Sequence, residues 1–321
     1  MTCEPNYSIA HIQSLSKERW LIRPEFHIPC MMLSIAIVVL YILELRVVLR
    51  YRRYAPFTST YFRVWTMQAT ADIASLFCYL IFSFTRNITI TWDFWMLLNR
   101  TCIPTLIIIL NGAVILSQMT GVAMASVNRY LKLCMPTSSV TGRFDATSTP
   151  HLAIIVIFIP FLVSSMILYN TAPIFVYIDG HSSVIAPCFR RPGKFVYSIV
   201  APLWCITTLF ISTICYSKII GRLSSMSYLK RRDLKTERML TMLSMPVFVS
   251  LWLVFLYYCC IALADVFHWA SLYDMLFAYY HLINLILSVT NPISALFSRD
   301  IRRRILFQHF EFSAQRHTFL S

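Results

Sequence analysis

Residues 102–134 read CIPTLIIILNGAVILSQMTGVAMASVNRYLKLC, and the first charged side chain among them is that of Arg129. A helix needs about 20 mostly apolar residues to cross the hydrocarbon core of a bilayer, where unpaired backbone groups are not tolerated. The uncharged run 102–128 exceeds that length. This stretch therefore predicts a membrane-spanning helix.

The composition of the whole chain agrees with this prediction. Hydrophobic residues make up 58% of the 321 residues and charged residues 13%, and the mean hydropathy is +0.64. Soluble domains carry roughly 45–50% apolar and about 25% charged residues. The 6 glycines and 14 prolines also exclude collagen-like and low-complexity classes. The chain is predicted to be an integral membrane protein.

Six other stretches have a similar length and apolar character, which predicts an all-α, seven-transmembrane helix bundle. It is expected to occupy residues 26–297, between an N-terminal segment, 1–25, and a C-terminal segment, 298–321. The sequence shows no repeat of roughly 20–50 residues, which favours one compact bundle. The seven predicted spans are Phe26–Leu45, Phe57–Phe84, Cys102–Met124 continuing to Cys134, His151–Tyr169, Phe195–Ile220, Met239–Ala264 and Leu272–Phe297.

Lysine and arginine are distributed unequally between the predicted loops. The net charge is +14, from 28 Lys+Arg and 14 Asp+Glu. Eight of the 28 fall on the side of the N-terminus, and the others on the opposite side or its boundary, including the runs 46–53, 218–238 and 299–316. Because an excess of Lys and Arg marks cytoplasmic loops, the N-terminus is predicted to be extracellular and the C-terminus cytoplasmic. This topology accounts for the charge, so no nucleic-acid partner is expected.

Two further features fall on the predicted exterior. The glycosylation sequons begin at Asn6, Asn87 and Asn99. Cys102 and Cys188 also lie on that side, where an oxidising environment permits a disulfide between them. Two free thiols are the alternative, and Cys3 and Cys30 lie near enough to the exterior that counting alone does not force the pairing.

Polar residues inside the spans are candidate functional residues. An acid such as Asp72 is rare within a membrane and marks a site by default. Asn284, Ser288 and Asn291 share one helical face, and together with Asp72 and Gln118 they are expected to form a polar network in the bundle core. The alternative is a set of separate polar residues that tie helices together individually.

The triplet Asn128-Arg129-Tyr130 closes the third span on the predicted cytoplasmic side. A guanidinium at this depth either acts as a switch, paired in a closed bundle and released when the helices part, or anchors the topology. Near the same side, Pro292 of Asn291-Pro292 removes a backbone donor from the seventh span and is expected to kink it.

Two basic segments are predicted to lie on the cytoplasmic side. Residues 298–310 combine an apolar stripe with a basic face, which is typical of a short amphipathic helix bound to inner-leaflet lipids. Residues 218–238 form either a docking surface or a topology determinant. The sequence contains no His-Glu-x-x-His, no Gly-x-Ser-x-Gly, no phosphate loop and no cluster of metal ligands, so no enzyme, cofactor or metal site is predicted.

Taken together, these residues resemble a G-protein-coupled receptor along nearly the whole chain. The stretch Phe57-Thr58-Ser59-Thr60-Tyr61-Phe62 leading to Asp72, and the triplet ending in Tyr130 leading to Pro136, are similar to nematode serpentine chemoreceptors of class V or class gamma of the Srg superfamily. Asn128 stands where an acid usually precedes the arginine, and Ala295 where a tyrosine is expected after Pro292. These departures fit a divergent branch of the receptors.

The resemblance implies a chemosensory receptor of the plasma membrane that binds a small-molecule or pheromone-like ligand and activates a heterotrimeric G protein. Polar and aromatic residues of the outer halves are its candidate ligand-binding residues, although they also suit a lipid-facing aromatic belt. A channel or transporter using Asp72, Gln118 and Asn284 is the alternative, which the missing repeats disfavour. The candidate ligand-binding residues are Asn111, Tyr169, Tyr197, Trp204, Tyr258, Tyr280 and His281.

Overall fold

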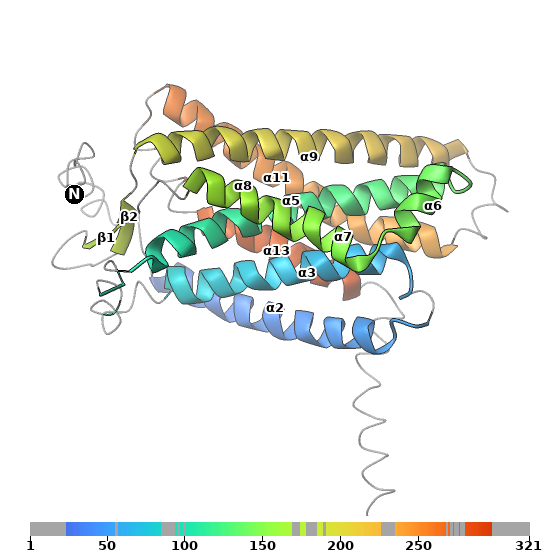
Figure 1. The fold of residues 1–321 in the computed structure, drawn as a ribbon, viewed down its shortest axis with the longest axis horizontal. Coiled ribbons are helices and arrows are strands. Elements are labelled where there is room, and N and C mark those ends of the chain that lie inside the picture. Colours follow the sequence, from blue (N-terminus) through green and yellow to red (C-terminus); the bar gives the residue numbers. More distant parts are fainter. Residues whose placement is uncertain are drawn as a thin grey trace, which may run out of the picture.

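A computed structural model describes residues 24–54, 57–84, 94, 97–98, 101–168, 174–177, 185–188, 191–225, 235–267, 269, 272, 276 and 280–296. Long helices lie side by side along most of the length of the molecule (Figure 1). They are α2 (Pro24–Arg50), α3 (Thr60–Cys78) with the π-helical turn η1 (Tyr79–Phe84), α5 (Ile103–Cys134), α7 (Thr149–Ala153) with the π-helical turn η4 (Ile154–Phe158) and α8 (Ile159–Leu168), α9 (Arg191–Ser225), α11 (Lys235–Val266) and α13 (Tyr280–Leu296).

The predicted seven-helix membrane bundle is confirmed. Among the described residues, six helices are long and apolar enough to cross a membrane, and the shorter apolar stretch Leu285–Leu296 of α13 is the seventh. Several helices run past the predicted ends of the spans: α2 continues to Arg50, α9 to Ser225, and α11 starts at Lys235. The predicted spans stopped near the first charges, whereas Lys, Arg and Glu are good helix formers, so the helical backbone continues beyond the apolar part.

The fourth span is less regular than the sequence suggested. Instead of one helix over His151–Tyr169, it consists of α7, the π-helical turn η4 and α8. Pro160 is the second residue after η4, and a proline has no N–H with which to bond the carbonyl of the residue four positions earlier. A π-turn beside it is one way for the helix to absorb that missing hydrogen bond.

The two ends of the bundle differ. Between α8 and α9 the chain forms an antiparallel ribbon of β1 (Ile174–Tyr177) and β2 (Ile185–Cys188), in which Ile174 pairs with Cys188. The sequence analysis did not predict this ribbon. At the opposite end lies the short helix α6 (Ser139–Ala146), beyond the last residues of α5 (Figure 1). These ends are called the ribbon end and, after the arginine near the end of α5, the Arg129 end.

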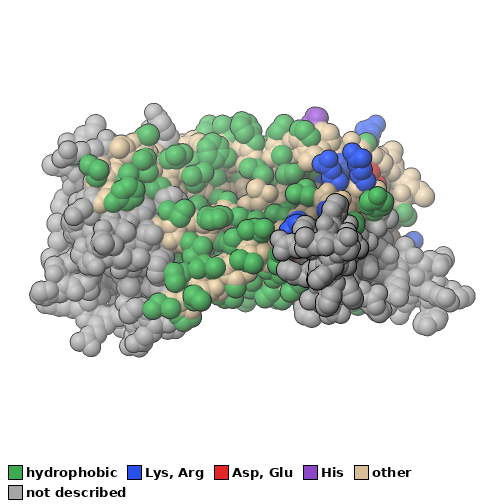
Figure 2. All heavy atoms as spheres, turned by 90° about the horizontal axis from the view of Figure 1, so that it is seen from below, with side chains coloured by type: hydrophobic (Ala, Val, Ile, Leu, Met, Phe, Trp, Pro, Cys, Tyr) green, Lys and Arg blue, Asp and Glu red, His purple; other side chains and the backbone are tan. Residues whose placement is uncertain are grey.

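Helix α5 forms the centre of the bundle. It contacts α3, α8, α9 and α11, and its residues Ile115, Leu116 and Met119 are fully buried. The outer faces of the helices instead expose large apolar side chains such as Met166 and Phe210, as expected where hydrocarbon replaces water. Figure 2 shows hydrophobic side chains over the middle of one face and lysines and arginines gathered toward one end of it.

Helices α3 and α5 approach each other closely at Gly121. A Cβ added at Gly121 would lie 3.0 Å from Cβ and Cγ of Gln68 on α3, whereas one added at Gly221 on α9 would meet nothing within 4 Å. Gly121 therefore sets the distance between the two helices at this level.

We expect Gly121→Val to lower the free energy of unfolding by about 1–3 kcal/mol, because the added methyl groups must push α3 away from α5. Gly221→Val is the matched control, and its effect should be much smaller. Thermal unfolding of both variants in the same detergent measures the difference. Equal melting temperatures would contradict the close approach of the two helices.

Candidate functional site

A buried carboxylate lies at the centre of a hydrogen-bonded cluster in the bundle core. The side chain of Asp72 on α3 is fully buried. Its Oδ1 accepts a hydrogen bond of 2.7 Å from Nε2 of Gln118 on α5. Its Oδ2 accepts hydrogen bonds of 2.5 Å from the Tyr41 hydroxyl on α2 and of 3.1 Å from Nδ2 of Asn291 on α13. Four helices therefore meet at one carboxylate.

The carbonyl of Ser288 joins this cluster because of Pro292. In a regular helix the carbonyl of Ser288 would accept from the N–H four residues later, but that residue is a proline without an N–H. The Tyr41 hydroxyl lies 2.9 Å from this carbonyl oxygen and shares its one proton between it and Asp72 Oδ2, which gives the buried carbonyl a donor. The Ser288 hydroxyl in turn lies 2.8 Å from Nε2 of Gln118. We call Tyr41, Asp72, Gln118, Ser288 and Asn291 the Asp72 cluster.

The structure thus brings together four of the five residues for which the sequence predicts a core network: Asp72, Gln118, Ser288 and Asn291. The side chain of the fifth, Asn284, lies outside the described residues. Tyr41 was missed. The available signal was Ser34, a polar residue in the first span that lies seven positions before Tyr41 on the same helical face. Both side chains are fully buried.

Arg129 lies inside the bundle and not at its surface. Its side chain is 1% exposed, and its guanidinium carbon is 4.3 Å from the centre of the Tyr61 ring on α3. Its Nη2 also donates a hydrogen bond of 2.7 Å to Oδ1 of Asn128. A simple topology anchor would reach the headgroups, whereas this cation is held by an aromatic face and a neutral amide.

A small cavity separates the Arg129 contact from the Asp72 cluster. Its lining includes Tyr61, which covers Arg129, and Asn291, which bonds Asp72, together with Gln68 and Tyr216. The cavity has a volume of about 10 Å³. This is near the space that a single water molecule requires, and the lining offers it polar partners. The two polar centres are therefore neighbours in the same core.

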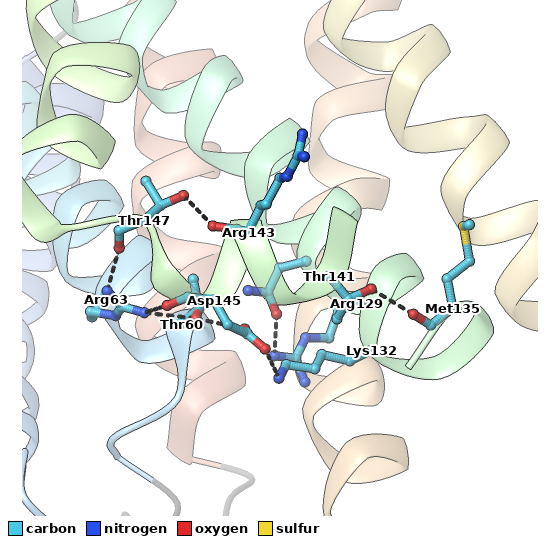
Figure 3. A network of polar contacts seen from close by, with 10 residues as sticks. Thr60, Arg63, Arg129, Lys132, Met135, Thr141, Arg143, Asp145 and Thr147 are labelled. Carbon is cyan, nitrogen blue, oxygen red and sulfur yellow. Dashed lines mark hydrogen bonds and ion pairs between the residues drawn. The ribbon is translucent and has the colours of Figure 1, made fainter. Parts of the chain in front are cut away.

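A second polar network ties α6 to the main helices at the Arg129 end. The carboxylate of Asp145 on α6 pairs with the Lys132 ammonium and accepts a hydrogen bond of 2.9 Å from the Thr60 hydroxyl. Arg63 donates to the carbonyls of Asp145, at 2.7 Å, and of Thr147, at 2.5 Å. Figure 3 shows Arg63 and Lys132 on opposite sides of Asp145. The sequence analysis missed this network.

A second buried acid contrasts with Asp72. Glu44 follows Tyr41 by three positions on α2 and is fully buried. Among the described residues, neither of its carboxyl oxygens has a hydrogen-bond partner. The sequence analysis also missed Glu44. It lies next to the end of the predicted first span, where a charged residue is expected to mark the boundary of the span and not a buried site.

The predicted ligand-binding residues are only partly described. Asn111 is half-buried on α5, and Nε1 of Trp204 on α9 donates a hydrogen bond of 3.0 Å to the Thr120 hydroxyl. Tyr258 is buried on α11. None of these three lines the cavity beside Asn291. The side chains of the other four, Tyr169, Tyr197, Tyr280 and His281, lie outside the described residues.

Other predicted features are also left open. Cys102 is exposed with a free thiol, and Cys188 is described only by its backbone at the end of β2, so their disulfide stays a prediction. The sequons at Asn6, Asn87 and Asn99 and the segment 298–321 lie outside the described residues. Tyr130 is half-buried and packs against the apolar cluster of Leu133, Tyr216 and Ile219.

We expect Tyr41→Phe to lower the free energy of unfolding by about 1–3 kcal/mol, because it leaves the Ser288 carbonyl and one Asp72 oxygen short of a buried donor. Tyr54→Phe is the matched control, since Tyr54 is 65% exposed. Thermal unfolding of the purified variants provides the measurement. An equal, small change in both variants would show that the Tyr41 hydroxyl contributes little to the cluster.

Comparison with known proteins gives the family. The model of the serpentine type 7TM GPCR chemoreceptor family Srv matches residues 30–310, which is most of the chain. No curated protein matches it. The match confirms the predicted resemblance and the receptor function, and it gives no support to a channel or transporter. It is a family of receptors and not of enzymes, and a ligand and a G protein are its general partners. The chain belongs to the Srv family of serpentine seven-transmembrane G-protein-coupled chemoreceptors.

Proposed function

We propose that this chemoreceptor lies in the plasma membrane with its ribbon end outside the cell and its Arg129 end in the cytoplasm. Basic residues support this orientation, because Arg46, Arg50, Lys218 and Arg222 lie in the parts of α2 and α9 nearest the Arg129 end. In this orientation the ribbon and the sequons at Asn6, Asn87 and Asn99 face outward. Cys102 and Cys188 face outward too, where an oxidising exterior permits a disulfide between them.

Ligand binding in the outer half opens the bundle around Arg129 and so activates a heterotrimeric G protein. The ligand is a small or pheromone-like molecule, and the seven residues named for it above are its candidate contacts. Asn128, Arg129 and Tyr130, with Asn291 and Pro292, form the switch, and residues 298–310 bind inner-leaflet lipids. A ligand drives this change only to the extent that it binds the open state more tightly than the closed one.

The observation that carries this proposal is the closed environment of Arg129. A permanent cation buried in a membrane bundle is unfavourable unless something compensates it. Part of this compensation comes from the Tyr61 ring, which covers the guanidinium, and Asn128 adds a neutral amide. Such a contact holds the bundle closed, and its release presents a guanidinium to a partner at the cytoplasmic face.

We expect Arg129→Ala to abolish G-protein activation by any compound that activates the native receptor. The compound is first identified in a heterologous reporter assay with a panel of volatile and pheromone-like molecules. Arg143→Ala is the control, because Arg143 is an exposed arginine on α6 that is outside the bundle core. Intact signalling by Arg129→Ala at equal surface expression would contradict the proposal.

The ring of Tyr61 gives a second, independent test. We expect Tyr61→Phe to retain near-native basal activity, because phenylalanine keeps an aromatic face over Arg129. Tyr61→Leu removes that face, and a desolvated cation–π contact of about 2 kcal/mol corresponds to about a thirtyfold shift toward the open state. Ligand-independent reporter activity, normalised to surface expression, distinguishes the two variants. Equal basal activity would mean that Tyr61 does not hold the closed state.

A further inference from the structure

An apolar groove lies between α9 and α11 toward the Arg129 end of the bundle. Its volume is about 570 Å³, which is within the range of about 300–1,000 Å³ that is typical of small-ligand sites. None of the described residues that line it is charged. The main apolar contributions come from Ile219, Ile220 and Leu223 of α9 and from Met242, Met245 and Val249 of α11.

The rim of the groove belongs to the outer, hydrocarbon-facing surface. On α11, Met242, Val249, Leu253 and Leu256 are all exposed, and their spacing places them on one face along the helix. Ile220 on the α9 side of the groove is 52% exposed. Exposed apolar side chains on membrane-spanning helices face lipid tails, so the groove opens sideways into the bilayer.

We propose that this groove binds one acyl chain of a bilayer phospholipid. The position of the groove decides the class of occupant, because a site that opens into hydrocarbon, and whose described lining is uncharged, is reached by lipid tails. Two methionines in the lining suit such an occupant, since their unbranched, flexible side chains adapt to a chain of variable shape. The phospholipid headgroup lies outside the groove, at the bilayer interface.

An acyl chain bound in the groove contacts Tyr216 of the receptor core. Tyr216 lines both this groove and the small cavity beside Tyr61 and Asn291. Its side chain is 2% exposed, so it fills the space between the two. A chain in the groove therefore supports the position of Tyr216 next to the switch, and this consequence for signalling rests on the proposed function.

The test uses the full chain in nanodiscs of phosphatidylcholine that contain a fraction of phosphatidylcholine with a diazirine in one acyl chain. After irradiation, mass spectrometry locates the adducts. We expect them to be enriched on residues 219–224 and 241–249 over the peptide that contains Met166, a 74% exposed residue on α8 away from the groove. Labelling no greater than at Met166 would overturn the proposal.

Two tryptophan variants show whether the groove itself is responsible. Ile220→Trp places bulk at the groove, whereas Leu203→Trp adds the same bulk to the same helix at a 56% exposed position outside it. We expect a several-fold loss of groove adducts for Ile220→Trp alone, and Met242→Trp replaces it if Ile220→Trp folds poorly. An unchanged yield of groove adducts in Ile220→Trp would refute the site. So would a competition experiment in which free fatty acid, but not unlabelled phospholipid, lowers the yield of groove adducts. Because the assay needs neither ligand nor G protein, its outcome is separate from that of the signalling tests.

Discussion

The bundle depends on how one carboxylate and one carbonyl are satisfied in a core without bulk water. Burying the Asp72 carboxylate is tolerable only because Tyr41, Gln118 and Asn291 hydrogen-bond it from three other helices. The Ser288 carbonyl needs a donor because Pro292 cannot supply one, and the Tyr41 hydroxyl lies within reach of both groups. A movement of α13 relative to α2 must therefore disturb the Asp72 carboxylate and the Ser288 carbonyl together, which makes the cluster the pivot in the proposed mechanism.

The pivot is connected to the Arg129 end by packing as well as by polar contacts. Gly121 allows α3 and α5 to approach, and this places Gln68 beside the cavity that Tyr61 and Asn291 also line. Tyr61 then covers Arg129 from the same helix that carries Asp72. Helix α3 thus presents one face to both polar centres, so a shift of α3 against α5 changes the surroundings of Asp72 and Arg129 at once. The physical element shared by the two centres is a rigid helix, not a chain of hydrogen bonds.

The sequence was sufficient where a local pattern decides the structure. The spans follow from length and apolarity, and Ser288 and Asn291 could be placed on one face by helical spacing alone. Tyr41 could not be singled out, because the spans contain many other aromatic residues. Only the structure shows that its hydroxyl reaches the Ser288 carbonyl, which Pro292 leaves without a backbone donor. The Asp145 network joins residues 82–85 positions apart, between a loop helix and the start of a span, and no periodicity links them. The ribbon likewise depends on the pairing of two short strands.

Buried polar atoms without hydrogen-bond partners are unevenly distributed, and their positions indicate where the helices would separate most easily. Among the described residues, the buried polar atoms without hydrogen-bond partners include both Glu44 carboxyl oxygens and Asn128 Nδ2. These lie toward the Arg129 end, whereas in the Asp72 cluster only Oε1 of Gln118 is in that state. Each such atom makes the closed arrangement less favourable than a fully bonded one would be. A rearrangement that admits water or a partner at the Arg129 end relieves that penalty, while one that opened the Asp72 cluster would create a new penalty. In the proposed mechanism the bundle would therefore open at the Arg129 end and pivot at Asp72.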